Sequence, residues 1–200
     1  MSGVGATQVK ALREATGAGM MDCKRALQEA GGDLDRAIEI LREQGLASAK
    51  KRAGRAANQG AVESYIHFNN SVGVLVEVNC ETDFVAKTDE FRSLARDIAI
   101  HIASMQPRWA AREDIPEEVI ASERRIYETQ VPEGKPENVI ERIIEGKFEA
   151  FYKDSVLVDQ PFVKDESKSV GELIDEVSAK VGEKVAARRF VRYKLGEETE

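Results

Sequence analysis

The spacing of apolar residues changes from helical to strand-like near residue 60, and this change most constrains the fold. Residues 62–68, VESYIHF, alternate between two faces, as a half-buried strand does. The turn-forming sequence Asn69-Asn70-Ser71 and the β-branched run 72–78, VGVLVEV, follow. The two runs predict a β-hairpin. A third alternating segment, 184–195, is expected to complete one antiparallel sheet.

Three shorter segments with helical spacing come before the hairpin. The first covers 7–16 and ends at the glycines of 17–19. Asp22 is expected to cap a second helix, and Asp33 a third that Gly45 closes. Three amphipathic helices within about 45 residues predict a small helical bundle close to the lower size limit for independent folding.

Helical patterns also dominate the region between the hairpin and the last strand. Apolar residues recur at helical spacing over 91–105, and a further helix is expected from about residue 170. Between them, a mostly polar segment at 117–130 and an apolar-striped one at 137–152 flank the short sequence PEGKP. Such a pair predicts a helical hairpin. The predicted class is therefore α+β: a three-helix domain, then an α+β core with a small antiparallel sheet and a helical hairpin.

The charge balance bears on partners and location. The net charge is −7, which disfavours direct binding to nucleic acid. One basic cluster, Lys50, Lys51, Arg52 and Arg55, is interpreted as a solvated linker, with nucleic-acid contact as the weaker alternative. No apolar run is long enough to span a bilayer, and the first residues lack the pattern of a signal peptide. The expected location is the cytoplasm.

The sequence offers no convincing active site. The common phosphate-loop, nucleophile-elbow and zinc-protease motifs are absent. Glu81 and Asp83 could contact a metal, but two carboxylates without further ligands are weak support for a metal site. Cys23 and Cys80 are interpreted as reduced thiols. We therefore predict no enzymatic activity, no catalytic residue, no bound metal and no cofactor.

Two apolar features are unusual for a purely structural role. Met20 and Met21 stand together where the first two predicted helices connect, and methionine adapts readily to partner surfaces. Phe84 follows a polar turn at the end of the valine-rich strand. The pattern alone leaves two possibilities for each: a core residue, or an exposed contact for a partner.

Long motifs connect these features to a known family. The stretches TGAGMMDCKRAL at 16–27 and CETDFVAKTDEF at 80–91 closely resemble bacterial translation elongation factor Ts. GDLDRAIEILRE at 32–43 and QPFVKDESKSVGELI at 160–174 do so as well. The resemblance runs from about residue 6 to about residue 196, with the motifs in the family's order.

The resemblance implies a guanine nucleotide exchange factor. Members of the family bind elongation factor Tu in its GDP form and speed GDP release. By the same resemblance, Met20 and Met21 dock on the partner. The resemblance further implies that one stretch inserts near the partner's Mg²⁺ site and displaces the ion. This stretch is Thr82, Asp83, Phe84 and Val85. The runner-up hypothesis is a general protein-interaction adaptor that uses the helical domain.

The resemblance also implies a domain division and an assembly. Residues 1–54 are expected to form a ubiquitin-associated-like three-helix domain plus linker, and residues 55–200 the core and dimerisation domain. The chain resembles the short form of the family, which lacks one of two related core halves. A single half leaves a sheet surface to cover, so we expect a homodimer. The candidate surfaces are the strand 184–195 and the apolar stripe of 137–152.

Overall fold

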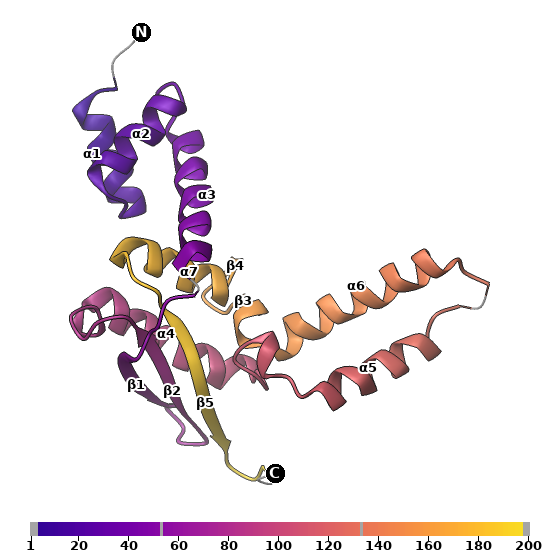
Figure 1. The fold of residues 1–200 in the computed structure, drawn as a ribbon. Coiled ribbons are helices and arrows are strands. Elements are labelled where there is room, and N and C mark those ends of the chain that lie inside the picture. The colour runs from indigo at the N-terminus through magenta and orange to yellow at the C-terminus, as the bar shows by residue number, and fades with distance from the viewer. Residues whose placement is uncertain (1–3, 53, 133, 198–200) are drawn as a thin grey trace. The chain divides into compact units, whose positions relative to one another are not determined.

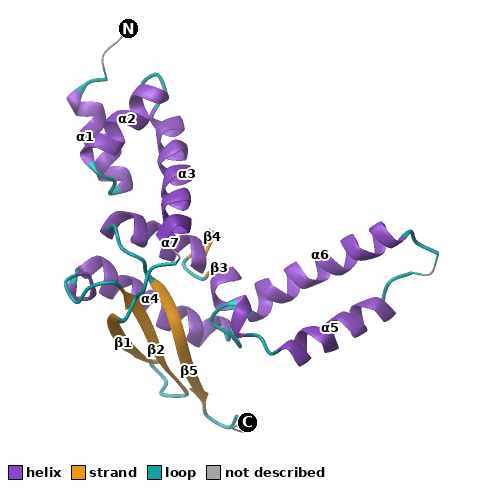
Figure 2. Cartoon of the chain, viewed as in Figure 1, coloured by secondary structure: helices purple, strands orange, loops and turns teal. Residues whose placement is uncertain are grey.

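The computed structural model describes residues 4–52, 54–132 and 134–197, apart from the side chains of residues 46–50. The chain folds into two compact units, each assembled from separate stretches of sequence. One unit comprises Met1–Ala61, Asn79–Leu94 and Glu172–Ala186, and the other comprises Val62–Val78, Ala95–Gly171 and Ala187–Glu200. Figure 1 follows the path of the chain, and Figure 2 shows the distribution of its helices and strands.

The expected N-terminal helices are present as α1 (Ala6–Thr16), α2 (Met20–Glu29) and α3 (Leu34–Arg52). Their apolar faces enclose one small core, which explains why the three helices form together. Its buried members are Val9, Leu12, Cys23, Ala26, Leu27, Ala37 and Ile40.

The ends of these helices differ from the sequence prediction in two places. Asp22 does not cap α2, because the helix begins two residues earlier and its N-cap is Gly19. Gly45 does not end α3, which continues to Arg52. A Cβ added at Gly45 would lie 3.6 Å from the Cβ of Ala179, so this glycine sits where α3 meets a second helix. Asp33 does cap α3, since its Oδ1 accepts the Arg36 N–H at 3.0 Å.

The predicted sheet is confirmed. It consists of β1 (Gln59–Ile66), β2 (Val72–Cys80) and β5 (Ala186–Lys194), in the order β1-β2-β5. One face of β2 is fully buried and supplies Val74, Val76, Val78 and Cys80 to the core. The opposite face of the sheet is exposed and unusually apolar. We call it the outer sheet face. Its large apolar side chains are Val62, Ile66, Leu75, Val191 and Tyr193, and it also carries the ion pair between Arg189 and Glu77.

Helix α4 (Asp89–Met105) contributes four large apolar side chains to the core: Phe91, Leu94, Ile98 and Ile102. Arg96 of α4 reaches β1 through an ion pair with Glu63 at 3.4 Å. Helices α5 (Glu117–Thr129) and α6 (Glu137–Ser155) form the expected helical hairpin (Figure 1). Their rings meet edge-on, with the Tyr127 and Phe148 centroids 5.2 Å apart. Ile144 and Phe148 of the 137–152 stripe are buried within the chain, whereas Val139, Ile140, Ile143 and Phe151 are partly exposed.

The remaining elements include a small strand pair that the sequence analysis did not anticipate, β3 (Pro161–Phe162) with β4 (Asp165–Ser169). Helix α7 (Val170–Val181) follows at the expected place. Single 3₁₀ turns occur at η1 (Val85–Lys87), η2 (Arg112–Asp114) and η3 (Leu157–Asp159).

Candidate functional site

Strand β2 leads directly into the segment that we call the TDFV loop, Thr82–Val85. The last inward-facing residue of the strand, Cys80, is fully buried, and its thiol donates to the Thr82 carbonyl at 3.1 Å. Burial, followed by the nearby Glu183 carboxylate, raises the pKa of this thiol. The thiol therefore keeps its proton and remains a donor at the base of the loop.

Further hydrogen bonds hold the loop within the turn itself and at its C-terminal end. The Ala86 N–H donates to the Thr82 carbonyl at 3.3 Å, and the Val85 N–H donates to Thr82 Oγ1 at 3.4 Å. Beyond η1, the Thr88 hydroxyl donates to the Val85 carbonyl at 2.8 Å and accepts the Phe91 N–H at 3.3 Å. Thr88 thus caps α4 while it closes the loop.

Phe84 is the aromatic residue of this loop. Its side chain is 78% exposed, whereas Phe91, seven positions later, is completely buried. The core alternative for Phe84 therefore does not match the structure. A large apolar ring in water, carried by a loop that is held at both ends, is a typical arrangement for a contact with another protein.

Asp83 projects beside Phe84 and is paired within the loop. Lys87 Nζ lies 2.6 Å from its Oδ2, and both side chains are about half exposed or more. The hydrogen bond and the charge of Lys87 lower the pKa of Asp83, so the carboxylate is ionised at neutral pH. An exposed pair of this kind is weak and can exchange its partner for a better one.

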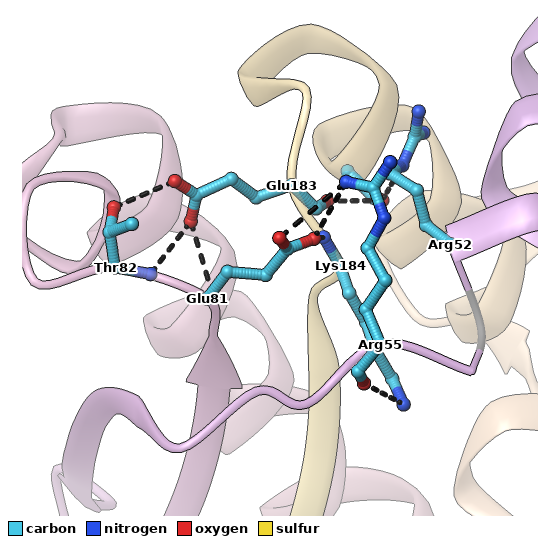
Figure 3. A network of polar contacts seen from close by, with 7 residues as sticks. Arg52, Arg55, Glu81, Thr82, Glu183 and Lys184 are labelled. Atoms are coloured by element: carbon cyan, nitrogen blue, oxygen red, sulfur yellow. Dashed lines mark hydrogen bonds and ion pairs between the residues drawn. The ribbon is translucent and has the colours of Figure 1, made fainter.

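A network of polar contacts joins the start of the loop to the segment that follows α7 (Figure 3). The carboxylate of Glu183, just after α7, accepts the Thr82 hydroxyl at 2.7 Å and the Thr82 N–H at 3.0 Å. It also accepts the Glu81 N–H at 3.2 Å. In return, Glu81 Oε1 accepts the Lys184 N–H at 2.6 Å. This bond is the main cause that lowers the pKa of Glu81.

The same network reaches the end of α3. Arg55 pairs with Glu81 at 3.2 Å, and its carbonyl accepts Lys184 Nζ at 3.1 Å. Arg52 Nε donates to the Ser178 hydroxyl at 3.3 Å. Helix α3 includes Lys50, Lys51 and Arg52, so these residues do not form the expected solvated linker. Arg52 and Arg55 are engaged within the chain. The side chain of Lys50 lies outside the described residues.

Met20 and Met21 occupy the first turn of α2. Gly17, in the left-handed conformation with φ 69°, ends α1, and Gly19 starts α2 two residues later. The tight connection leaves the methionines outside the helical core, 48% and 65% exposed. Both methionines and the TDFV loop belong to the same compact unit.

The described residues hold no group of three or more metal-ligating side chains. Glu81 and Asp83 are each engaged with a cation or an N–H group rather than facing one another. Among the described helices, none is long and apolar enough to cross a membrane.

Comparison with known proteins gives these features a context. The family model described as "Elongation factor TS" matches residues 7–197. The chain belongs to the elongation factor Ts family. An elongation factor Ts from Moorella thermoacetica is 56% identical over 97% of this chain and 96% of its own length. One from Carboxydothermus hydrogenoformans is 59% identical over 94% of this chain and 88% of its own length. Membership of this family assigns the chain a role in translation elongation.

The family motif stands at the TDFV loop, but one residue that shapes the loop was missed by sequence reasoning. Glu183 lies about a hundred positions later, in the short sequence Val181-Gly182-Glu183-Lys184. Nothing in that stretch signals a partner near residue 82, because a glutamate after a helix-ending glycine is an ordinary surface residue. Only the folded chain brings the two together.

Proposed function

We propose that this chain is the guanine nucleotide exchange factor for elongation factor Tu. It binds the GDP form, displaces Mg²⁺ and promotes GDP release. The observation that carries the proposal is the exposed ring of Phe84, presented by a loop with hydrogen bonds at both ends. Membership of the elongation factor Ts family points to the same partner.

The chemistry of the loop suits such a task. A bound guanine nucleotide is held by backbone groups around its phosphates and by Mg²⁺ that bridges phosphate oxygens. Phe84 supplies the volume to separate side chains packed around that site. Asp83 supplies a carboxylate that competes for the cations and N–H groups surrounding the phosphates. The loop contributes geometry and charge rather than covalent chemistry, so this chain is not an enzyme.

Linkage defines what the factor can achieve. If binding of this chain lowers the affinity of elongation factor Tu for GDP by a given ratio, bound GDP lowers the affinity of elongation factor Tu for this chain by the same ratio. Each tenfold of this mutual effect corresponds to about 1.4 kcal/mol. Met20 and Met21 dock on the partner outside the nucleotide site, so affinity is retained while the TDFV loop acts on GDP.

The direct test follows a fluorescent GDP analogue bound to elongation factor Tu, at increasing concentrations of this chain. We expect release to accelerate and to saturate, and to respond less to added Mg²⁺ than spontaneous release does. Release no faster than in a blank with an inert protein would contradict the proposal. The adaptor hypothesis would then be the one to pursue.

We also propose the division of labour and the setting. Residues 1–54 serve as the docking domain and its linker, and residues 55–200 carry the exchange loop and the dimerisation surface. Neither a metal nor a cofactor of its own takes part, and nucleic acid is not bound directly. The site of action is the cytoplasm, where translation elongation takes place.

A homodimer completes the proposal, with the outer sheet face as its interface. This face exposes Val62, Ile66, Leu75, Val191 and Tyr193. Apolar patches of this kind on a soluble chain mark association surfaces. Gly73 contributes to its flatness, because the Ile66 side chain lies 3.0 Å from where a Cβ would stand.

The test of the dimer is light scattering of the parent and of Leu75→Glu. The parent is expected at twice the chain mass of 22.1 kDa and the variant at 22.1 kDa. Leu75 is already 49% exposed, so a glutamate there leaves the core intact. Ile126→Glu, an exposed apolar position on α5, is the matched control and should remain dimeric. A parent mass of a single chain at micromolar concentration would refute the dimer.

A further inference from the structure

Resting on the proposed exchange function, we propose that Glu183 is the positioning residue of the TDFV loop. It touches no nucleotide or partner in this role. It sets the conformation from which Phe84 acts, by accepting hydrogen bonds from the two residues that begin the loop.

We call the hydrogen-bonded contact between residues 81–82 and residues 183–184 the clasp. One carboxylate oxygen, Oε2, accepts the N–H groups of Glu81 and Thr82, at 3.2 and 3.0 Å. The other, Oε1, accepts the Thr82 hydroxyl at 2.7 Å. Both oxygens are thereby used on one short piece of backbone.

The segment that carries Glu183 is itself rigid. Gly182 ends α7 in the left-handed conformation, with φ 74°, and its N–H donates to the Ser178 carbonyl at 3.0 Å. Three residues after Gly182, the chain enters the core through Val185, which is buried. Ser178 adds a bond from its hydroxyl to the Glu183 carbonyl at 2.6 Å. The carboxylate therefore extends from a fixed point.

The contact is reciprocal, as Figure 3 shows. Glu183 accepts from the backbone of Glu81, and Glu81 accepts from the backbone of Lys184 at 2.6 Å. Arg55 adds its charge to the Glu81 carboxylate at 3.2 Å. Two side chains thus join two backbone segments about a hundred residues apart, just beyond the end of the pairing between β2 and β5.

The functional consequence follows from the exposure of Phe84. No core contact fixes this ring, so its position depends on the backbone beneath it. Without Glu183, the N–H groups of Glu81 and Thr82 would turn to water, and the loop would sample more conformations. A wedge in many conformations still meets its partner but seldom enters the nucleotide site. The maximal rate of exchange should then fall.

The experiment measures GDP release from elongation factor Tu over a range of concentrations of the parent and of Glu183→Ala. If Glu183 positions the loop, the maximal rate falls about tenfold or more, whereas the half-saturating concentration changes little. Loss of folding would look different. Unfolded molecules only reduce the active concentration, so the half-saturating concentration would rise at an unchanged maximal rate.

Two further variants sharpen the result. Glu183→Gln should restore most of the maximal rate, because its carbonyl oxygen can accept both N–H groups while its amide donates to Thr82 Oγ1. Glu145→Ala removes the same charge from an exposed position on α6 and should behave as the parent. Hydrogen exchange gives an independent readout: the amides of Glu81 and Thr82 should exchange faster in Glu183→Ala, with the amides of buried β2 residues unchanged.

The outcomes separate this inference from the function on which it rests. If the parent does not accelerate release, the exchange function itself is refuted. If the parent accelerates release and Glu183→Ala matches it, Glu183 does not position the loop. Failure of Glu183→Gln alongside Glu183→Ala would assign the effect to the charge rather than to the clasp, and would likewise overturn the proposal.

Discussion

Replacing Phe84 by alanine should separate folding from function in this chain. The side chain is 78% exposed, so only about a fifth of it contributes to the stability of the isolated protein. Truncating a fully buried phenylalanine costs about 3–5 kcal/mol, and the exposed one should therefore cost less than ~1 kcal/mol. The urea midpoint of unfolding of the variant should be almost the same as that of the parent.

The effect on exchange should be much larger. An aromatic side chain covers about 150–250 Å² when buried, at about 25 cal/mol per Å². If the exposed part of Phe84 is covered in the complex with elongation factor Tu, roughly 3–5 kcal/mol of interaction is lost on truncation. Release of the fluorescent GDP analogue should slow by roughly a hundredfold to a few thousandfold.

The matched control is Phe91→Ala, seven residues along the chain and wholly buried. It should lose about 3–5 kcal/mol of unfolding free energy, visible as a large shift of the urea midpoint. If Phe84→Ala destabilised the chain as much as Phe91→Ala, the ring would belong to the core. If Phe84→Ala were stable and fully active, the TDFV loop would not be the exchange element.

Two further predictions concern other parts of the chain. Met21→Ala removes a side chain that is 65% exposed, so it should raise the half-saturating concentration for GDP release at nearly unchanged stability and maximal rate; a lowered maximal rate alone would contradict a docking role. Burial lowers the pKa of His101, whose Nδ1 accepts the Val163 N–H at 3.2 Å, so the folded state favours neutral imidazole and its stability should fall as the pH drops below about 6.5. Urea midpoints at about pH 7.5 and about pH 5.5 should show this drop in the parent and little of it in His101→Gln, whereas an equal drop in both would assign it to other groups.

The periodicity of the sequence predicted most of the elements because burial on one face imposes it. The valine-rich run at 72–78 became β2, and the segment 184–195 contains β5. Alternation identifies two faces but not which one is covered. On β1, the half-buried face holds Glu63 and Tyr65, because Arg96 pairs with Glu63 from α4. The apolar residues Val62 and Ile66 point to the outside.

Helix ends were harder to predict, because the same residue can stop a helix or allow a close approach. Gly45 was expected to end α3, yet it lies in the middle of the helix beside Ala179 of α7. Glycine costs a helix only about 1 kcal/mol, which tertiary contact readily outweighs. The pair β3–β4 was missed since strands of two and five residues carry too little periodicity to detect.

The candidate site was predictable in part. Its prominent residues, Phe84, Met20 and Met21, were singled out from sequence as apolar side chains in polar surroundings, and the structure shows all three exposed. Their roles toward a partner remain predictions. The supporting shell was not predictable. Arg55, Glu81 and Glu183 are common surface residue types, and only the tertiary fold brings their side chains into one network.

The clasp between residues 81–82 and 183–184 has a consequence for biosynthesis. A chain emerging from the ribosome completes β2 and the TDFV loop about a hundred residues before Glu183 is added, since the bonded pairs are separated by 101 to 103 positions. At bacterial rates of about 5–20 residues per second, the loop spends several seconds without its acceptor. Throughout that interval, the N–H groups of Glu81 and Thr82 lack the Glu183 carboxylate that accepts them in the folded chain. If Glu183 positions the loop as proposed, the newly made factor acquires its working shape only after residue 183 has been added.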